Sequence, residues 1–255
     1  MAKVQIGFFS FTEITDAAEH RSYNEWHQLD HMPEQYPLAG VVFGQRWVST
    51  PACRRAREYD DPSLAPVHYM TLYLMGEPLD ETLREFRALG ERLRAEGRFH
   101  QHRRSRLSGP LAVIDMQVAP RVLVSAQSVP YRPNRGIYVV VRDGTVAQRG
   151  GPVPPDSARR DVDDEDTRLA DALLEEEGVA GVWTFATDRR FDDHGWHPGD
   201  RTVTVSYLDA DPLTVAPRLG ELVRGSAEAT KRPVVFAGPF QTITPWSWDW
   251  FDGTT

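Results

Sequence analysis

Two histidines four residues apart, with carboxylates beside them, are the residues of this chain best suited to chemistry. His27 and His31 would lie on neighbouring turns of one helix, with Glu34 continuing the stripe and Asp30 next to it. Imidazole titrates near neutral pH, so this stripe could accept and donate protons in a reaction. A solvated polar helix face is the alternative interpretation, although such faces favour Lys and Glu.

The opposite side of this segment predicts how the helix packs. Four residues are predicted to form the face that docks on a sheet: Trp26, Leu29, Met32 and Tyr36. Pro33 removes a backbone donor and disfavours helical geometry at the residue before it. We therefore expect the helix to end or kink near His31, which would turn this imidazole away from its regular position.

The stretch from Tyr23 to Trp47 resembles part of the dimeric α/β-barrel superfamily, most closely its EthD-like group. The similar groups are Trp26-His27, Asp30-His31-Met32-Pro33-Glu34, Ala39-Gly40-Val41 and Gln45-Arg46-Trp47. The resemblance implies a ferredoxin-like fold and matches His31 to the family histidine, whereas His27 has no such counterpart. This superfamily includes monooxygenases, dehydratases, cyclases, haem enzymes and plain ligand binders, so the resemblance implies the fold more firmly than the reaction.

The chain repeats one order of elements, βαββαβ, which is the split ferredoxin-like unit. The first half is predicted to contain strands at 3–11, 67–75 and 110–118, a further strand that ends at Trp47, and a second helix at 80–96. The second half is predicted to contain strands at 136–142, 179–187, 201–208 and 233–244, with helices at 163–177 and 212–225.

Three short motifs recur in the same order in the two halves. They are Tyr73 to Leu79 with Tyr207 to Leu213, Ala39-Gly40-Val41 with Ala180-Gly181-Val182, and Gly109-Pro110-Leu111 with Gly238-Pro239-Phe240. The predicted fold is α+β, with ferredoxin-like repeats at 1–125 and 126–255. Their antiparallel four-stranded sheets would pack face to face as an intrachain dimeric α/β barrel.

The second repeat serves as an internal control for the histidine cluster. Alignment on the Ala-Gly-Val motif places Arg168 at the position of His27 and Ala172 at the position of His31. The corresponding helix of the second repeat therefore lacks the histidine cluster, so the cluster is not a general feature of this helix in the repeat. We expect one specialised pocket in the first half, and the further candidates for binding a substrate are Tyr23, Trp26, Tyr36, His68 and Tyr73.

Two other stretches have open interpretations. The Gly/Pro-rich connection at 144–161 is expected to be disordered or a lid, and the loop at 188–200, with His194 and His197, is expected to be exposed rather than a cation site. The C-terminal Pro245 to Phe251 holds three tryptophans and should pack against something. A homodimer through sheet edges or through this tail is one assembly that the pattern allows.

Composition and charge limit the classes of molecule that the protein is expected to bind. The net charge of −8 and the pI near 5.5 argue against nucleic acid, and the Arg-rich stretch at 92–106 is interpreted as a solvated helix end and loop rather than an anion site. Cys53 is the only cysteine, which favours a reducing compartment. No apolar run approaches the ~20 residues of a membrane helix. We expect a cytoplasmic protein whose partner is a small molecule.

The leading hypothesis is an enzyme that needs no cofactor and acts on a small apolar oxygenated molecule, aromatic or polyketide-like. His31 would act as general base or acid, tuned by Asp30 or Glu34, with Tyr23 or His27 positioning a carbonyl, in a dehydration, cyclisation or isomerisation whose rate changes near pH 6 to 7. One alternative is a metal- or haem-dependent oxidoreductase using His27, His31 and Glu34. Another is a non-catalytic binding or interaction protein.

Overall fold

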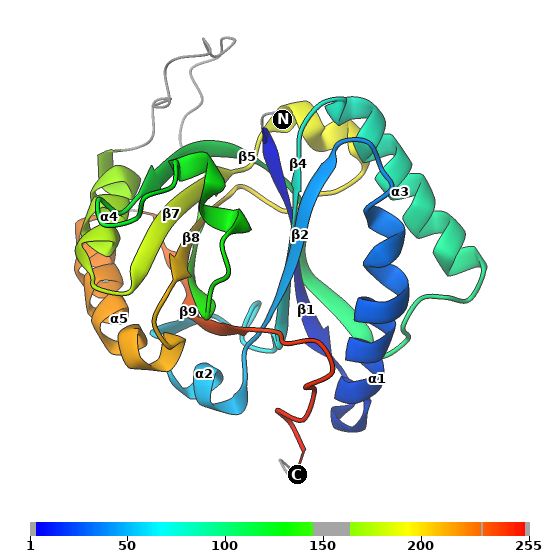
Figure 1. Ribbon diagram of the computed structural model, residues 1–255, viewed down its shortest axis with the longest axis horizontal. Helices are drawn as coiled ribbons and strands as arrows, with labels where there is room; N and C mark the ends of the chain where they lie inside the picture. Colours follow the sequence, from blue (N-terminus) through cyan, green and yellow to red (C-terminus); the bar gives the residue numbers. More distant parts are fainter. Residues whose placement is uncertain (1–3, 145–163, 231, 253–255) are drawn as a thin grey trace.

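Strands from both halves of the chain build one closed antiparallel barrel (Figure 1). The computed structural model describes residues 4–144, 164–230 and 232–252. The first half contributes β1 (Ile6–Ile14), β2 (Val41–Val48), the short β3 (Tyr59–Asp60), β4 (Tyr69–Met75) and β5 (Arg103–Val118). The second half contributes β6 (Gly136–Asp143), β7 (Val179–Ala186), β8 (Arg201–Leu208) and β9 (Val234–Thr242).

Each half has the same strand order. The order is β2-β4-β1-β5 in the first half and β7-β8-β6-β9 in the second, and the halves join through β5–β7 and through a short β2–β9 pairing. The prediction of two ferredoxin-like repeats in one chain is confirmed. The two sheets are joined at both edges, and so they enclose the core as a barrel.

Helices cover the outside of the barrel. The first half carries α1 (His20–Trp26), a π-helical segment (His27–His31), a 3-10 turn (Pro33–Gln35) and α3 (Leu79–Ala95). The insertion after β2 forms α2 (Pro51–Arg55), and its β3 pairs with β9. The second half carries the 3-10 segments Ala126–Tyr131 and Arg189–His194, and the helices α4 (Asp164–Glu175) and α5 (Pro212–Ala229).

Strand register shows which residues of the two halves correspond. In both halves the first strand pairs with the last strand at a Gly-Pro motif. Pro110 of β5 lies opposite Phe8 of β1, and Pro239 of β9 lies opposite Tyr138 of β6. This motif match is confirmed. The match of Tyr73–Leu79 with Tyr207–Leu213 is shifted by one residue. It aligns Leu79 with Leu213, but the helices α3 and α5 begin at Leu79 and Pro212, so Leu79 corresponds to Pro212.

The Ala-Gly-Val match is wrong by three residues. The carbonyl of Gly40 accepts a hydrogen bond from the Gly76 amide, and the carbonyl of Gly178 accepts the equivalent bond from Asp209. Gly40 therefore corresponds to Gly178, not to Gly181. Both glycines enter a strand where another part of the chain passes closely, and Gly178 has a positive φ of 101°. The alignment that placed Arg168 and Ala172 opposite the histidines does not hold.

Side chains from both halves fill the barrel. Phe9, Phe11 and Trp47 of the first half pack in one cluster with Trp183 and Phe236 of the second. Outside the second-half sheet, α4 and α5 pack directly on the strands through a cluster that includes Leu169, Leu173 and Leu219. The two repeats thus share one core, and the outer face of the second sheet is closed by apolar packing.

Two strands of the first sheet differ from their predicted bounds. β1 runs to Ile14 rather than Phe11, and β5 begins at Arg103 rather than at Pro110. The extra residues of β5 belong to a polar, Arg-rich stretch that lacks strand-like apolar alternation. The predicted strand residue Lys3, the predicted helix residue Asp163 and the connection 145–161 lie outside the described residues.

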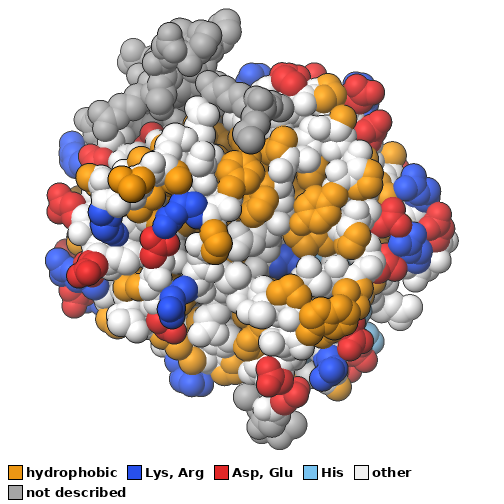
Figure 2. Space-filling model, viewed as in Figure 1, with side chains coloured by type: hydrophobic (Ala, Val, Ile, Leu, Met, Phe, Trp, Pro, Cys, Tyr) orange, Lys and Arg blue, Asp and Glu red, His pale blue; other side chains and the backbone are white. Residues whose placement is uncertain are grey.

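The C-terminal tail packs, as predicted, on the end of the first half. Trp248 is buried beside Tyr23 and Tyr69, and the Phe251 ring stacks on His20 at 3.8 Å, whereas Trp246 is 72% exposed. In Figure 2, charged side chains gather at the helical edges, and the middle of this face, over β2, is mostly uncharged with several apolar side chains. Among the described residues, no helix has the length and apolar character to cross a bilayer.

Candidate active site

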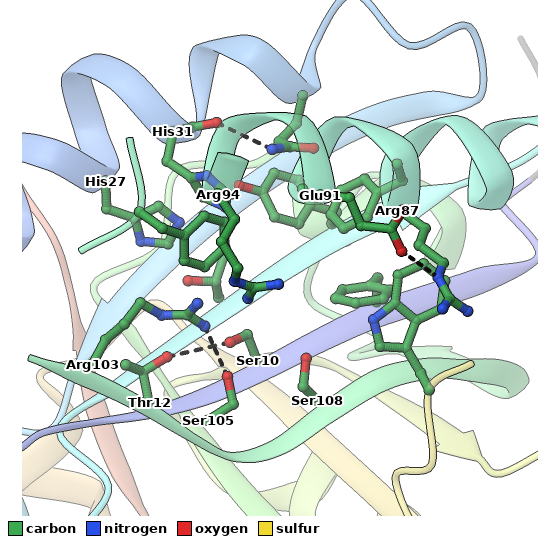
Figure 3. A pocket seen from close by; sticks show the side chains of 18 of the residues that line it. Ser10, Thr12, His27, His31, Arg87, Glu91, Arg94, Arg103, Ser105 and Ser108 are labelled. Atoms are coloured by element: carbon green, nitrogen blue, oxygen red, sulfur yellow. Dashed lines mark hydrogen bonds and ion pairs between the residues drawn. The ribbon is translucent and has the colours of Figure 1, made fainter. Parts of the chain in front are cut away.

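A cavity of about 310 Å³ lies between the outer face of the first-half sheet and the helices that cover it (Figure 3). The sheet contributes Phe8, Ser10, Thr12, Thr71, Tyr73, Arg103, Ser105 and Ser108 to its wall. The helical side contributes Tyr23, Trp26, His27, His31, Gln35, Phe86, Arg87, Gly90, Glu91 and Arg94, and Phe99 follows α3. Alternation along β1 and β4 directs every second side chain into this space.

The wide turn of the π-helical segment brings both histidines to the cavity. The Met32 amide donates to the carbonyl of His27 at 2.9 Å, five residues back, just before Pro33, which has no amide hydrogen to donate. The predicted kink near His31 is confirmed. π-helical turns are frequent at functional sites, because they shift side chains out of the regular helical register.

The two imidazoles lie among aromatic rings. His27 is buried, and its Nδ1 lies 3.2 Å from the hydroxyl of Tyr23. The His31 ring stacks on Trp26 at 4.6 Å, meets the edge of Phe99 at 5.3 Å and lies 5.3 Å from the His27 ring. The Nδ1 atom of His31 is buried without a hydrogen-bond partner.

Both histidines are neutral at physiological pH. Burial lowers the pKa of His31 to about 3, helped by the positive charge of Arg103 and opposed by the Asp30 carboxylate. Burial also lowers the pKa of His27 well below its ordinary value, and the cations Arg46 and Arg103 add to this effect. The predicted rate change near pH 6 to 7 is therefore not expected from His31 in the unliganded cavity.

Arg46 is a second cation behind the cavity wall. It is 3% exposed, its guanidinium donates to Asn24 at 2.9 Å, and it lies 5.4 Å from the centre of the Tyr23 ring. No carboxylate of the described residues forms an ion pair with it. This buried charge favours neutral imidazoles and would stabilise negative charge on a bound molecule.

Asp30 and Glu34 face away from the cavity, toward Arg98. The Arg98 guanidinium donates to both carboxylates at 2.7 Å, and the Trp26 indole donates to the Arg98 carbonyl at 2.7 Å. Asp30 still raises the pKa of His31 through its charge, whereas Glu34 does not join the histidines. The predicted ligand set His27, His31 and Glu34 is not assembled, and the described residues contain no group of three His, Cys, Asp or Glu side chains arranged to hold a metal ion.

Thr71 and Tyr73 place buried hydroxyl groups in the sheet wall. The two side chains are 1% and 3% exposed, and neither oxygen has a hydrogen-bond partner among the described residues. Burial of Tyr73 raises the pKa of its phenol. Unpartnered buried hydroxyls cost stability, and because these two line the cavity, a bound molecule could supply their missing hydrogen bonds.

Three sequence predictions are not met around the cavity. Leu29 and Tyr36 are about half exposed, at 50% and 47%, so neither is buried against the sheet, and Tyr36, a predicted substrate contact, does not line the cavity. The helix instead turns its histidine side to the sheet, and Tyr36 reaches back to donate to the Gly44 carbonyl. His68 does not line the cavity: it precedes β4, accepts from the Ile14 amide, and contacts Arg54 and the Phe251 ring.

Most of the cavity wall was not predicted, including Arg94, Phe99, Arg103 and Trp196. Arg103 lies in the stretch interpreted as a solvated loop, and the early start of β5 directs it inward. Trp196 belongs to the loop expected to be exposed, but this loop crosses from the second half and its indole meets Phe8 at 5.0 Å. Contacts of this kind join residues far apart in the sequence, and nothing in the sequence indicates them.

Cys53 is buried, and burial raises the pKa of its thiol, although Thr50 donates a hydrogen bond that partly opposes this. It lies in α2, and it is not part of the cavity wall. A protonated, buried thiol is a poor nucleophile.

The sequence matches no protein-family model and no curated protein. Solved structures with the same fold do exist. A candidate chlorite dismutase matches over 97% of this chain and 98% of its own, with a TM-score of 0.51 and 13% identity. A candidate monooxygenase from Fusobacterium nucleatum matches over 96% of this chain and 94% of its own, with a TM-score of 0.50 and 10% identity. At such low identity the match shows the fold alone: this chain has the duplicated ferredoxin-like fold of the dimeric α/β-barrel proteins.

Proposed function

We propose that the first-half cavity is the active site of an enzyme that moves a proton on a small, flat, oxygenated aromatic molecule. His31 would be the proton acceptor and donor, and its reaction would need no cofactor. One observation carries the proposal: neutral imidazoles and unpartnered buried hydroxyls share one cavity that also has aromatic side chains in its wall. The resemblance of the His31 segment to EthD-like proteins supports the same choice of residue.

The proposed reaction begins at a carbon next to a carbonyl group. The neutral imidazole of His31 takes a proton from this carbon, and the C–H electrons form the double bond of an enolate. The carbonyl oxygen, which gains the negative charge, would accept hydrogen bonds from Tyr73 and Thr71 and feel the positive charge of Arg103. Return of the proton to another carbon completes an isomerisation, and its transfer to a departing hydroxyl completes a dehydration.

Aromatic walls would hold the substrate in a defined orientation. Trp26, Phe86, Phe99 and Trp196 surround the cavity, and Phe8 meets both Phe86 and Trp196 within about 5 Å, at 4.7 and 5.0 Å. Rings of this kind stack on flat ligands and exclude water, which strengthens electrostatic interactions inside the site. A flat molecule that carries both an aromatic ring and oxygen atoms is therefore the substrate class that this wall accommodates.

Proton transfer can be tested without knowing the natural substrate. In D2O, wild-type protein should accelerate exchange of the hydrogens next to the carbonyl of 2-tetralone, followed by NMR, and His31→Asn should lower this rate by roughly 100-fold or more. Because the pKa of His31 is about 3, the wild-type rate should stay level from pH 7.5 to pH 5. His102→Asn, outside the cavity wall, is the matched control.

Other results would support the competing functions. Exchange that is equally fast in His31→Asn would remove this histidine from the reaction. Metal content or a visible absorption band in the purified protein would support the oxidoreductase alternative. Saturable binding of flat ketones without any exchange would support a binding protein.

A further inference from the structure

We propose that the cavity selects aromatic carboxylates, whose carboxylate group binds the guanidinium of Arg103 while the aromatic ring lies against the apolar wall. This deepens the proposed function by naming the substrate class, and it rests on the same cavity serving as the active site.

Arg103 is a shielded cation without an acidic partner. Within the described part of the chain its guanidinium makes one hydrogen bond, to the Ser105 hydroxyl at 2.8 Å, and no ion pair. It lies 5.0 Å from the centre of the Phe99 ring and 5.9 Å from that of Trp26. A guanidinium has five N–H donors, so most of them remain available for a ligand.

A second cation reaches the same space. Arg94 lies 4.5 Å from the centre of the Phe99 ring, and Figure 3 shows its guanidinium and that of Arg103 ending in the central part of the cavity. Arg94 also forms no ion pair with a described carboxylate. The acid in the cavity wall, Glu91, is bound to Arg87 at 3.0 Å, so its charge is already balanced.

The local charge is opposite to that of the whole protein. The chain carries a net charge of −8, yet the cavity wall has two cations that no described acid compensates. Arg94 is exposed to solvent, whereas Arg103 is shielded, and shielding a charge from water is costly unless a partner such as a bound anion compensates for it. The charge pattern therefore favours an anionic ligand over a neutral one.

The shape and chemistry of the wall favour a carboxylate on an aromatic ring over an inorganic anion. The planar guanidinium matches the two oxygens of a carboxylate, and the rings beside Arg103 accept a flat apolar body. A cavity of about 310 Å³ exceeds what a small inorganic anion fills. Thr12 and Ser10, beside Arg103, offer hydroxyls to the same group.

The test compares 1-naphthoate with 1-naphthamide, which has nearly the same shape but no charge, by isothermal titration calorimetry. We expect wild-type protein to bind the naphthoate at least about tenfold more tightly than the amide. Arg103→Gln should abolish this preference. Arg104→Gln should keep it, because the neighbouring side chain is 63% exposed and lies outside the cavity wall.

Each outcome decides the proposal. Equal affinity of wild-type protein for acid and amide would overturn it, and this comparison needs no variant, so misfolding of Arg103→Gln would not obscure the result. Binding of sulfate or nitrate without binding of either aromatic probe would also overturn it, in favour of an inorganic anion site. Because binding is measured without turnover, a failed exchange reaction would leave this result intact, and a failed preference would leave the exchange reaction intact.

Discussion

At the scale of single residues, the cavity combines groups that are costly to bury. Neutral His31 and the hydroxyls of Thr71 and Tyr73 contribute polar atoms that have no partner, while Arg103 contributes a charge. Such atoms reduce stability unless something binds to them. In this cavity they lie close enough together for one bound molecule to partner several of them.

Tyr69 and Tyr73 on β4 allow a direct test of this difference. The Tyr69 hydroxyl accepts from Asn24 and contacts His20 Nδ1, both at 2.9 Å, whereas the Tyr73 hydroxyl has no partner. Tyr69→Phe should therefore cost about 1–3 kcal/mol of unfolding free energy, and Tyr73→Phe should cost nothing or increase stability. Urea denaturation of both variants measures this, and an equal loss in the two would contradict a ligand-binding role for the Tyr73 hydroxyl.

At the scale of elements, one arginine holds the helix of the site in place. Arg98, just after α3, binds Asp30 of the π-helical segment and Glu34 of the 3-10 turn, and its carbonyl accepts from Trp26. The carboxylates that the sequence assigned to catalysis thus connect two elements. They position His31 from outside the cavity.

Loss of this connection should loosen the segment more than the whole protein. The ion pairs are about one third exposed, so Arg98→Ala should change the melting temperature little. Amide hydrogen exchange of residues 27–35 should become faster, because the helix loses its anchor to α3. Arg21→Ala, which breaks only the exposed pair with Glu25 on the same helix, should leave exchange there unchanged. Equal exchange in the two variants would disprove the anchoring role.

At the scale of the whole molecule, the two halves are alike in topology and different in use. The first sheet carries a cavity beneath its helices, whereas Leu169 and Leu173 fill the corresponding space of the second. The second half also supplies Trp196, which completes the cavity wall. The first half therefore forms the candidate site, and the second half acts as a scaffold that closes part of its wall.

Buried histidines make the stability of the whole protein dependent on pH. Burial lowers the pKa of His20 to about 4 and those of His31 and His68 to about 3, while the unfolded chain titrates near 6.5. Between these pKa values the unfolded state binds more protons than the folded state. The free energy of unfolding is therefore highest above pH 6.5 and falls as the pH is lowered toward 4. Each such histidine contributes roughly 1.4 kcal/mol per pH unit within that range.

Urea unfolding at pH 7.5, 6 and 5 measures this dependence, in a range where most carboxylates stay ionised. The free energy of unfolding should decrease from the first pH to the last. The variant His31→Asn lacks one of these buried imidazoles. Its free energy of unfolding should therefore decrease less over the same pH range, by at most the contribution of one histidine. A stability that is constant across the three conditions would contradict neutral, shielded imidazoles.

Much of the fold was predictable because its signals are local. Strand alternation, helical periodicity and the Gly-Pro pairs at 109–110 and 238–239 each lie within short stretches. Pro33 likewise predicted the kink beside His31, since the loss of an amide hydrogen acts on neighbouring residues. The Ala-Gly-Val alignment misled because a short motif can recur by chance, and only hydrogen-bond register relates Gly40 to Gly178.

The sequence by itself determined the α+β repeat, the position of the helix break and the histidines His27 and His31 as candidates for chemistry. Only the tertiary structure decided that these imidazoles face a cavity, that Arg103 and Trp196 complete its wall, and that Asp30 and Glu34 bind Arg98 instead. The physical reason is that pKa values and pockets depend on burial and on neighbours brought together across the chain, which no local pattern records.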